Sequence, residues 1–465
     1  MNVLVLEAST SAAKAMVYSK SSGVLRVEVS PYSEAISTSD THDAQGVFKL
    51  LMEVGCKASS GFDISSVAIV GTWHSLLLCR NNQPKTPVYT WAYTGAADAA
   101  QKIHSDSGLS RRLYEKTGCM PHASYPFYKL IYLKEQIQNI DDYDIFGLGE
   151  YIFTKITDVR GVSLNMASGT GLMNKKSLDW DDEILELAGI SRNQLPSLFS
   201  HNHHFPLNKT YANVLGISVG IPVTLPYADG CMNQLGVGAF RPGVMTMSIG
   251  TSCAIRCITD SPLSADKLNG LWEYYALDNW IIGAATSGGT NCVDWFQKTM
   301  GNGLSLKELD NTVHAEDIPV FLPFLYGERC PGWDASRRGG FLNLSSSHDA
   351  GSMYSALLEG ILFNVFQCYE QLRQTMVISK INLSGGILYS PVWKQMAADI
   401  WGQDMYVPDT EQASMLGGAC MGLHALKQID SLTDFVQPEY LSVKYRPKMQ
   451  DYYKNQFQKY LNAYK

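Results

Sequence analysis

The sequence predicts an α/β protein of two domains, and three observations support this prediction. Short apolar segments alternate with segments of helical periodicity through both halves of the chain. At 465 residues the chain is longer than one hydrophobic core usually organises. A strand, a turn of small residues and a second strand occur twice, at 3–18 and 244–258. This repetition suggests a duplicated architecture, although unrelated β-hairpins could show the same short similarity.

The first half opens with a strand at 3–6, a turn at 8–11 and a strand at 13–18. Two further short strands are expected at 67–72 and 76–79. Helical patterns occupy 110–117, 129–136, 151–157 and 180–188, the last with Asp179 as its cap. A connecting loop rich in proline and histidine, at 195–206, precedes a strand at 222–225 that leads to Asp229.

The second half begins with the hairpin at 244–258, whose turn is Gly250-Thr251-Ser252. Apolar residues at helical spacing predict a helix over 353–372. A strand at 381–383 then enters the turn Ser384-Gly385-Gly386, and helices are expected at 393–401 and 414–426.

Composition narrows the class of protein. The net charge of −7 offers no basic surface for nucleic acid or anionic lipid. No apolar run approaches the ~20 residues of a membrane span, and the apolar N-terminus reads as a buried strand. The ten cysteines form no C-x-x-C pair, so reduced buried thiols and a cytoplasmic location are expected.

Asp229 is the strongest candidate for catalysis. A carboxylate at a strand end can take a proton from a substrate hydroxyl, although the same residue could cap a helix starting near Cys231. About twenty residues later, the Gly250-Thr251-Ser252 turn offers N–H groups and hydroxyls to a phosphate, or is an ordinary hairpin turn. Together they suggest phosphoryl transfer to an alcohol.

Other segments allow two readings each. Gly385 and Gly386 would let a nucleotide approach the backbone, or form an ordinary tight βα turn. His74 could bind a substrate hydroxyl or be a satisfied core histidine, and Trp91 could face a sugar, although core packing is favoured for it. The segment 328–333, which contains Glu328 and Arg329, could bind an anionic group or form a surface ion pair.

Three histidines, at 201, 203 and 204, suggest a metal at first sight. They lie in the proline-rich loop without an acidic or cysteine partner at ligand spacing. A metal site is therefore not expected there.

These motifs resemble the FGGY carbohydrate kinases over nearly the whole chain. The resemblance is carried by the N-terminal hairpin and by three segments: Ser248-Ile249-Gly250-Thr251-Ser252, Ser384-Gly385-Gly386 and Ala413–Ala419. Within the family the chain is most similar to the gluconokinases, through the segments His74–Leu78, Thr86–Ala92, Ala167–Leu172, Leu178–Asp181 and Glu328–Trp333.

The resemblance implies two RNase H-like domains of the actin, hexokinase and Hsp70 superfamily around a central cleft. Residues 1–228 would form the sugar-binding domain and 229–465 the nucleotide-binding domain. Asp229 would be the catalytic base. The residues implied for substrate are His74, Trp91, Glu150 and Asp229. Those implied for ATP are Thr10, Ser11, Lys14, Gly250, Thr251, Gly289, Gly385, Gly386 and Ser390, with Glu7 and Asp229 for Mg²⁺.

Three departures from the family pattern bear on function. The first phosphate segment reads Glu7-Ala8-Ser9-Thr10 where relatives have Asp-x-Gly-Thr. Tyr93-Thr94-Gly95 replaces Asp-Asn-Arg after Trp91-Ala92, which removes a carboxylate and a guanidinium from near the sugar. Ala228 stands where many relatives have Gly or Ser.

The expected function is ATP-dependent phosphorylation of a sugar or sugar acid, with gluconate converted to 6-phosphogluconate as the first choice. Xylulose, or another polyol or ketose, is the alternative substrate. A non-catalytic sugar-sensing protein of the same fold is the alternative of another class, motivated by Glu7 and Ser9. The partner would be a small molecule and neither nucleic acid nor membrane. The family resemblance allows a homodimer, although no segment identifies an interface.

Overall fold

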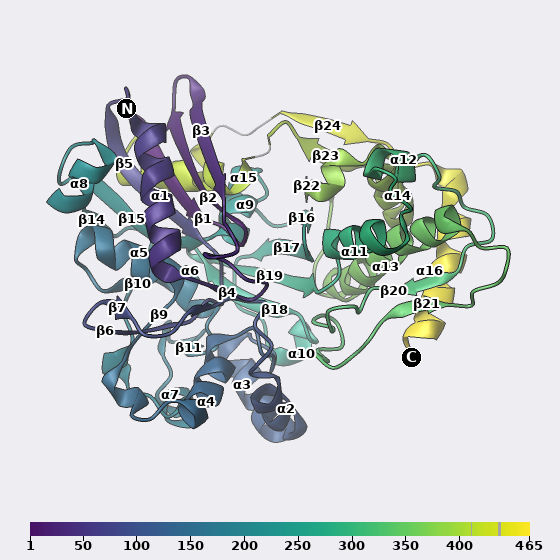
Figure 1. The fold of residues 1–465 in the computed structure, drawn as a ribbon, viewed down its shortest axis with the longest axis horizontal. Coiled ribbons are helices and arrows are strands. Elements are labelled where there is room, and N and C mark those ends of the chain that lie inside the picture. The colour runs from purple at the N-terminus through teal and green to yellow at the C-terminus, as the bar shows by residue number, and fades with distance from the viewer. Residues whose placement is uncertain (411, 436–438) are drawn as a thin grey trace.

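Two large β-sheets organise the chain (Figure 1). The computed structural model describes residues 1–410, 412–435 and 439–465. We call the part built around the first sheet, residues 1–236 with 413–435, the first lobe. The part built around the second sheet, residues 244–408 with 439–465, is the second lobe. Among the described residues, no helix has both the length and the apolar character needed to cross a membrane.

The first sheet has six strands. In spatial order they are β14 (His204–Pro206), β15 (Pro222–Ala228), β5 (Ile64–Gly71), β1 (Asn2–Ala8), β2 (Ala12–Ser19) and β3 (Gly23–Pro31). The central strand β1 is apolar from Val3 to Leu6 because both of its faces are covered. Leu6 lies against Gly55 of α1 (Ala44–Ser59), whereas Val3 and Val5 point to the other face and meet α15 (Ala413–Ala425).

The second sheet has seven strands. In spatial order they are β18 (Trp272–Ala276), β19 (Asn279–Thr286), β17 (Cys253–Thr259), β16 (Val244–Ile249), β22 (Lys380–Gly385), β23 (Met405–Pro408) and β24 (Tyr440–Val443). Around β16, two antiparallel neighbours lie on one side and two parallel ones on the other. The strands around β1 pair in the same way, which confirms the duplicated architecture.

Helices and small sheets complete each lobe. In the first lobe the remaining helices are α2 (Ala97–Ser105), α3 (Ser107–Thr117), α4 (Pro126–Gln136), α5 (Leu148–Thr157), α6 (Leu164–Ser168), α7 (Asp182–Ala188), α8 (Lys209–Leu215) and α9 (Asp229–Gly236). Those of the second lobe are α10 (Ala265–Leu268), α11 (Thr290–Met300), α12 (Leu306–Asp310), α13 (Ala350–Thr375), α14 (Pro391–Trp401) and α16 (Gln450–Tyr464). The short strands are β4 (Thr41–His42), β6 (Leu77–Arg80), β7 (Gln83–Pro84), β8 (Val88–Tyr89), β9 (Asp144–Phe146), β10 (Gly161–Ser163), β11 (Met173–Asn174), β12 (Asp179–Trp180), β13 (Ser197–Phe199), β20 (Val320–Leu322) and β21 (Gly340–Leu342).

Two local predictions were wrong. Asp179 does not cap a helix, because it pairs in β12, and the cap of α7 is Asp181, whose carboxylate accepts the N–H of Ile184 at 3.2 Å. The segment 195–206 is not all loop, since it contains β13 and the edge strand β14. The proline and histidine content concealed strands of three residues each.

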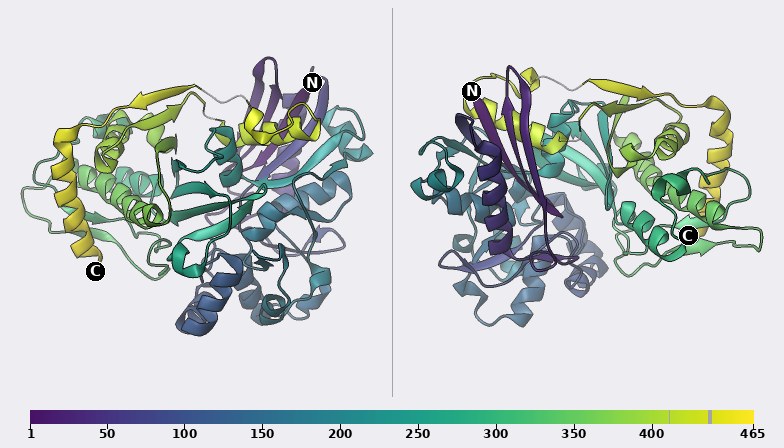
Figure 2. Two further views of the ribbon diagram at one scale, coloured as in Figure 1. Left: turned by 180° about the vertical axis from the view of Figure 1, so that it is seen from behind. Right: turned by 45° about the horizontal axis from the view of Figure 1, so that its top comes forward.

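Helix α15 comes late in the sequence and yet packs on the first sheet (Figure 2). Its glycines allow this close approach, because a Cβ at Gly418 would lie 2.7 Å from Val5 Cγ1 and one at Gly422 would lie 2.3 Å from Val3 Cγ1. Ser66 of β5 also donates a hydrogen bond to the Gly422 carbonyl at 3.2 Å. The first lobe therefore needs residues from near the end of the chain.

The two lobes contact each other through β18, the edge strand of the second sheet. The N–H of Glu273 donates to the Gly118 carbonyl at 3.0 Å, and the N–H of Tyr275 donates to Ser168 Oγ at 3.0 Å. The Glu273 carboxylate is fully buried and pairs with Lys175 Nζ at 2.8 Å. These bonds fix β18 against the first lobe.

Candidate active site

A cavity of about 210 Å³ lies where the two lobes meet. Its lining comes from the turns at the ends of β1, β5 and β16, from β17 and β18, and from isolated residues of both lobes. These residues are Thr10, Thr72, Trp73, His74, Trp91, Asp229, Ser248, Gly250, Thr251, Ser252, Cys253, Ala254, Arg256, Trp272, Tyr274, Ala285 and Arg329. Six residues that the family resemblance implies for the site are thus brought together: Thr10, His74, Trp91, Asp229, Gly250 and Thr251.

Asp229 lies directly after β15, at the first residue of α9. It is not the cap of a helix starting near Cys231, because the helix begins at Asp229 itself and Ala228 occupies the cap position. The carboxylate accepts the N–H of Gly230 at 2.7 Å. Burial raises the pKa of Asp229 to about 6; the charge of Arg256 opposes this rise and that of Glu7 adds to it. The group is therefore ionised at neutral pH and basic enough to take up a proton.

The turn between β16 and β17 is held from behind by the start of α11. The N–H of Thr290 donates to the Gly250 carbonyl at 2.7 Å, and Gly289 and Gly385 have no room for a Cβ, which would lie 2.5 Å from the carbonyl oxygens of Gly250 and Ile249 respectively. Within the described part of the chain, the N–H of Thr251 has no acceptor. A supported turn with a free amide suits an anionic phosphate.

His74 presents one defined nitrogen to the cavity. Its Nδ1 lies 2.6 Å from the Gly169 carbonyl oxygen, and a carbonyl can only accept, so we assign the proton to Nδ1. Burial lowers the pKa of His74 to about 3, helped by the charges of Lys129 and Arg329. The ring is therefore neutral, and Nε2 is an acceptor for a substrate hydroxyl.

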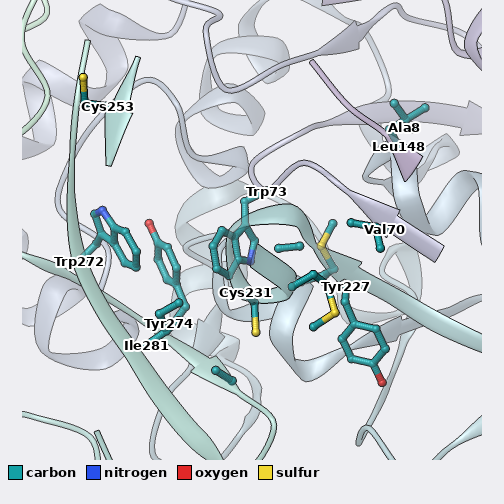
Figure 3. Packing of buried hydrophobic residues seen from close by; sticks show 14 of the residues in the cluster. Ala8, Val70, Trp73, Leu148, Tyr227, Cys231, Cys253, Trp272, Tyr274 and Ile281 are labelled. Carbon is teal, nitrogen blue, oxygen red and sulfur yellow. The ribbon is translucent and has the colours of Figure 1, made fainter. Parts of the chain in front are cut away.

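Aromatic rings form one wall of the cavity. Trp272 and Tyr274 project from the same face of β18 and stack with centroids 4.6 Å apart, and Trp73 packs against Tyr274 at 5.0 Å (Figure 3). From the first lobe, Trp91 donates its indole N–H to Thr10 Oγ1 at 3.2 Å. Such rings suit the C–H faces of a carbohydrate. Sequence analysis missed Trp272 and Tyr274 because strand pairing in the second lobe brings them to the site.

Two arginines of the second lobe border the same cavity. Arg256 projects from β17 and approaches Gly230, and Arg329 lies 4.9 Å from the Trp91 ring and donates to the Thr286 carbonyl at 2.7 Å. Among the described residues, neither guanidinium has a carboxylate within 4.0 Å, and the buried Nε atom of each has no partner. The sequence signal for Arg256 was present but unused: one charge in the apolar strand Cys-Ala-Ile-Arg-Cys-Ile.

The loop that carries Arg329 is anchored by its neighbour. Glu328 is buried and accepts from Arg337 at 3.0 Å and from the Tyr464 hydroxyl at 2.7 Å. The two charges of this segment therefore separate, because Glu328 enters a buried network while Arg329 faces the cavity. The surface ion pair considered from the sequence was wrong.

Glu7 supplies a carboxylate of the kind that binds Mg²⁺. It is buried, Lys14 Nζ lies 3.5 Å from its Oε1, and Ser414 donates to its Oε2 at 2.8 Å. Its charge raises the pKa of Asp229, so the two carboxylates repel each other across the site. Hard oxygen donors of this kind fit Mg²⁺, which binds one or two carboxylates together with substrate phosphates and water.

Several residues proposed from the sequence lie outside the cavity lining: Glu7, Ser11, Lys14, Glu150, Gly289, Gly385, Gly386 and Ser390. Glu150 is buried in the first turn of α5, and burial raises its pKa to about 7. Ser390 caps α14 by accepting the N–H of Trp393 at 3.1 Å. Gly386 approaches Thr290 under the phosphate turn. Their proposed roles remain predictions.

Comparison with known families gives two matches along the chain. Residues 2–236 match the N-terminal domain of the FGGY family of carbohydrate kinases, and residues 245–426 match the C-terminal domain.

Among individual relatives, the chain is 29% identical to the gluconokinase of Bacillus subtilis, over 92% of this chain and 88% of that one. It is 27% identical to the xylulose kinase of Lactococcus lactis, over 80% and 76%. Two solved structures from Lactobacillus acidophilus are similar at 26% identity. The xylulose kinase has a TM-score of 0.91 and the gluconate kinase one of 0.90, and at least 97% of each chain is covered.

Proposed function

The chain belongs to the FGGY family of carbohydrate kinases, and within that activity we propose that it transfers the γ-phosphoryl group of ATP to a sugar acid, with gluconate as acceptor and 6-phosphogluconate as product. The similarity to gluconokinases supports this substrate, while the similarity to xylulose kinases leaves a neutral ketose to be distinguished.

One observation carries the choice of a sugar acid. Arg256 and Arg329 bring two positive charges to the cavity, and among the described residues neither guanidinium has a carboxylate within 4.0 Å, although the charge of Asp229 acts on Arg256 from further away. Desolvated cations without a close counter-ion are costly, and a substrate carboxylate would supply one. Each charge-assisted hydrogen bond is worth about 1.5–3 kcal/mol, so two together favour an acid over a neutral analogue by about 10²–10⁴-fold.

The transfer step follows from the position of Asp229. Its carboxylate accepts the proton of the sugar's primary hydroxyl as that oxygen forms a bond to the γ-phosphorus. The bond from the γ-phosphorus to the bridging oxygen breaks, and ADP leaves with that oxygen. His74 Nε2 accepts a second hydroxyl and so fixes the sugar in register, while the rings of Trp272 and Tyr274 cover its apolar face.

The second lobe binds the phosphates of ATP. The supported turn that follows Gly250 offers the free backbone N–H of Thr251 to the transferred phosphoryl group, where negative charge is concentrated. Mg²⁺, bound with ATP near Glu7 and Asp229, would neutralise part of the phosphate charge.

A coupled ADP-release assay tests the choice of substrate. The panel contains gluconate, glucitol (the neutral six-carbon polyol), xylulose and glycerol. We expect kcat/KM for gluconate to exceed that for glucitol by at least about 100-fold, from two charge-assisted bonds. Equal or better turnover of xylulose or glucitol would overturn the assignment to a sugar acid, while the family activity would stand.

Substitution of the arginines tests the same assignment from the side of the protein. Arg256→Met and Arg329→Met should each lower kcat/KM for gluconate by about 10–150-fold and leave the low activity on glucitol unchanged. Arg338→Met is the matched control, because Arg338 lies on the same loop as Arg329, is exposed and bonds only to neighbouring carbonyls.

A further inference from the structure

Lys129, in the first turn of α4, has an unusual environment for a lysine. Its side chain is fully buried, and no carboxylate of the described residues lies within 4.0 Å of Nζ. Burial lowers the pKa of Lys129 well below its usual range, and only the more distant charge of Asp40 opposes this. A buried cation without a close counter-ion is kept only where hydrogen bonds satisfy it.

Backbone carbonyls supply those bonds. Nζ lies 2.6 Å from the His74 oxygen, 2.6 Å from the Thr90 oxygen and 2.8 Å from the Ser124 oxygen, with the Tyr89 oxygen at 3.4 Å. Carbonyls can only accept, so three short contacts require three N–H donors. The group is therefore an ammonium, whose three protons are all in use.

The three carbonyls belong to three separate segments, of which two border the cavity and the third packs behind it. One is His74 itself, one precedes Trp91 at position 90, and one precedes Tyr125, whose hydroxyl lies 2.8 Å from the Tyr274 hydroxyl. The segments are distant in sequence and meet at a single nitrogen. A shift of Lys129 would therefore move the hydrogen-bonding nitrogen of His74 and two aromatic groups together.

His74 also has backbone strain that this contact holds in place. Its φ is +68°, in the left-handed region that non-glycine residues rarely adopt. Such a conformation costs of order 1–3 kcal/mol and persists only where its surroundings enforce it. The 2.6 Å bond from Lys129 to its carbonyl, together with the bond from its Nδ1 to Gly169, fixes both the backbone and the ring.

We propose that Lys129 is a positioning residue for the sugar, a three-point clamp that sets the geometry of the sugar-facing half of the cavity without touching the substrate. The clamp acts on the first lobe alone, because all three carbonyls lie there, whereas the phosphate turn lies in the second lobe. This inference rests on the proposed binding of the sugar in this cavity.

The test compares the effect of one substitution on KM for the sugar with its effect on KM for ATP. Lys129→Met has a similar length and no donors. We expect KM for gluconate to rise at least about tenfold and kcat to fall, since misplacement of about 1 Å can cost 10²-fold in rate. KM for ATP should stay within about twofold of wild type, which a general loss of structure would not allow. Lys134→Met is the matched control, on the same helix and exposed, and should change neither constant.

The outcomes are distinct. If both KM values stay within twofold, or if both rise equally, the clamp is refuted. If Lys129→Met does not fold, Lys129→Gln, which keeps two N–H donors, is judged by the same split between the two KM values. If the wild type does not phosphorylate gluconate, the proposed function fails, and the clamp is then tested with the sugar that the wild type does accept.

Discussion

Replacement of Asp229 by asparagine should make the protein more stable and less active. The folded protein raises the pKa of this carboxyl from 3.8 to about 6, mainly because the group is buried. The ionised form is therefore disfavoured in the folded state relative to the unfolded chain. Above pH 6 the carboxylate reduces the free energy of unfolding, and a neutral amide of the same shape avoids this cost while it keeps the bond from the Gly230 N–H.

The magnitude follows from linkage. A shift of about two pKa units corresponds to about 3 kcal/mol at pH 8, where the carboxyl is ionised in both states. The gain shrinks as pH falls through 6, because the folded wild type becomes protonated. At pH 5 roughly half remains, and the gain vanishes well below the unfolded pKa of 3.8.

Thermal unfolding of the wild type and Asp229→Asn, in parallel at pH 8 and pH 5, measures this difference. Asp260→Asn on the exposed surface of the second lobe is the control and should show no gain at either pH. A variant that is no more stable than the wild type at pH 8, or whose gain is the same at both pH values, would refute the account of Asp229 as a destabilised buried carboxylate.

The same carboxylate governs activity. As a general base it is expected to contribute about 10²–10⁴ in kcat, with KM for gluconate largely kept in Asp229→Asn. In the wild type, kcat/KM should decrease as the pH is lowered, with an apparent pKa of about 6. The second pKa of a phosphate also lies near 6, so the fall in rate could come from ATP. The Arg256→Met variant distinguishes the two groups. It removes a charge that lowers the pKa of Asp229, and it should therefore move the low-pH fall of kcat/KM, the acid limb of the profile, to higher pH. An unmoved limb would assign the titration to ATP.

Three further substitutions test the phosphate side of the cavity. Gly250→Ala should fold as the wild type does, because a Cβ at this position meets nothing closer than 3.9 Å in the protein, and it should raise KM for ATP, because that Cβ would stand where a phosphate approaches. Gly385→Val should instead lower the stability of the fold, since φ of Gly385 is +85° and a Cβ would lie 2.5 Å from the Ile249 carbonyl oxygen. Unchanged KM for ATP in Gly250→Ala, by steady-state titration, would remove the turn from the nucleotide site. Glu7→Gln should raise the Mg²⁺ concentration needed for half-maximal rate and move the acid limb of Asp229 to lower pH, because the charge of Glu7 raises that pKa; a metal titration with no change would exclude Glu7 from the Mg²⁺ site.

Much of the architecture could be predicted from local sequence signals. The run Val3–Leu6 is apolar because its strand is covered on both faces, and the glycine turn at 385 marks a place where the backbone leaves no room for a side chain. Asp229 was found because a carboxylate at the end of an apolar strand is conspicuous. These signals act over a few residues, so the sequence alone shows them.

The missed features depend on contacts between distant segments. Tyr274 reaches the cavity because β18 is bonded to the first lobe, and nothing near it in the sequence indicates this. Lys129 reads as one more lysine in a helix until three separate carbonyls are placed around it. The cap of α7 was misplaced by two residues because Asp179 and Asp181 are equally suitable caps, and the pairing of β12 decides between them.

The position of α15 has a consequence for how the protein is made. The first lobe's sheet emerges from the ribosome early, yet the face that carries Val3, Val5 and Val70 is covered only when residues 413–425 have been synthesised. At about 5–20 residues per second, the wait between residues 236 and 425 is on the order of ten to forty seconds. During that interval an apolar sheet face is open to other nascent chains and to chaperones. A shorter chain that ended after the strands of the first lobe would lack α15 and would leave this face uncovered.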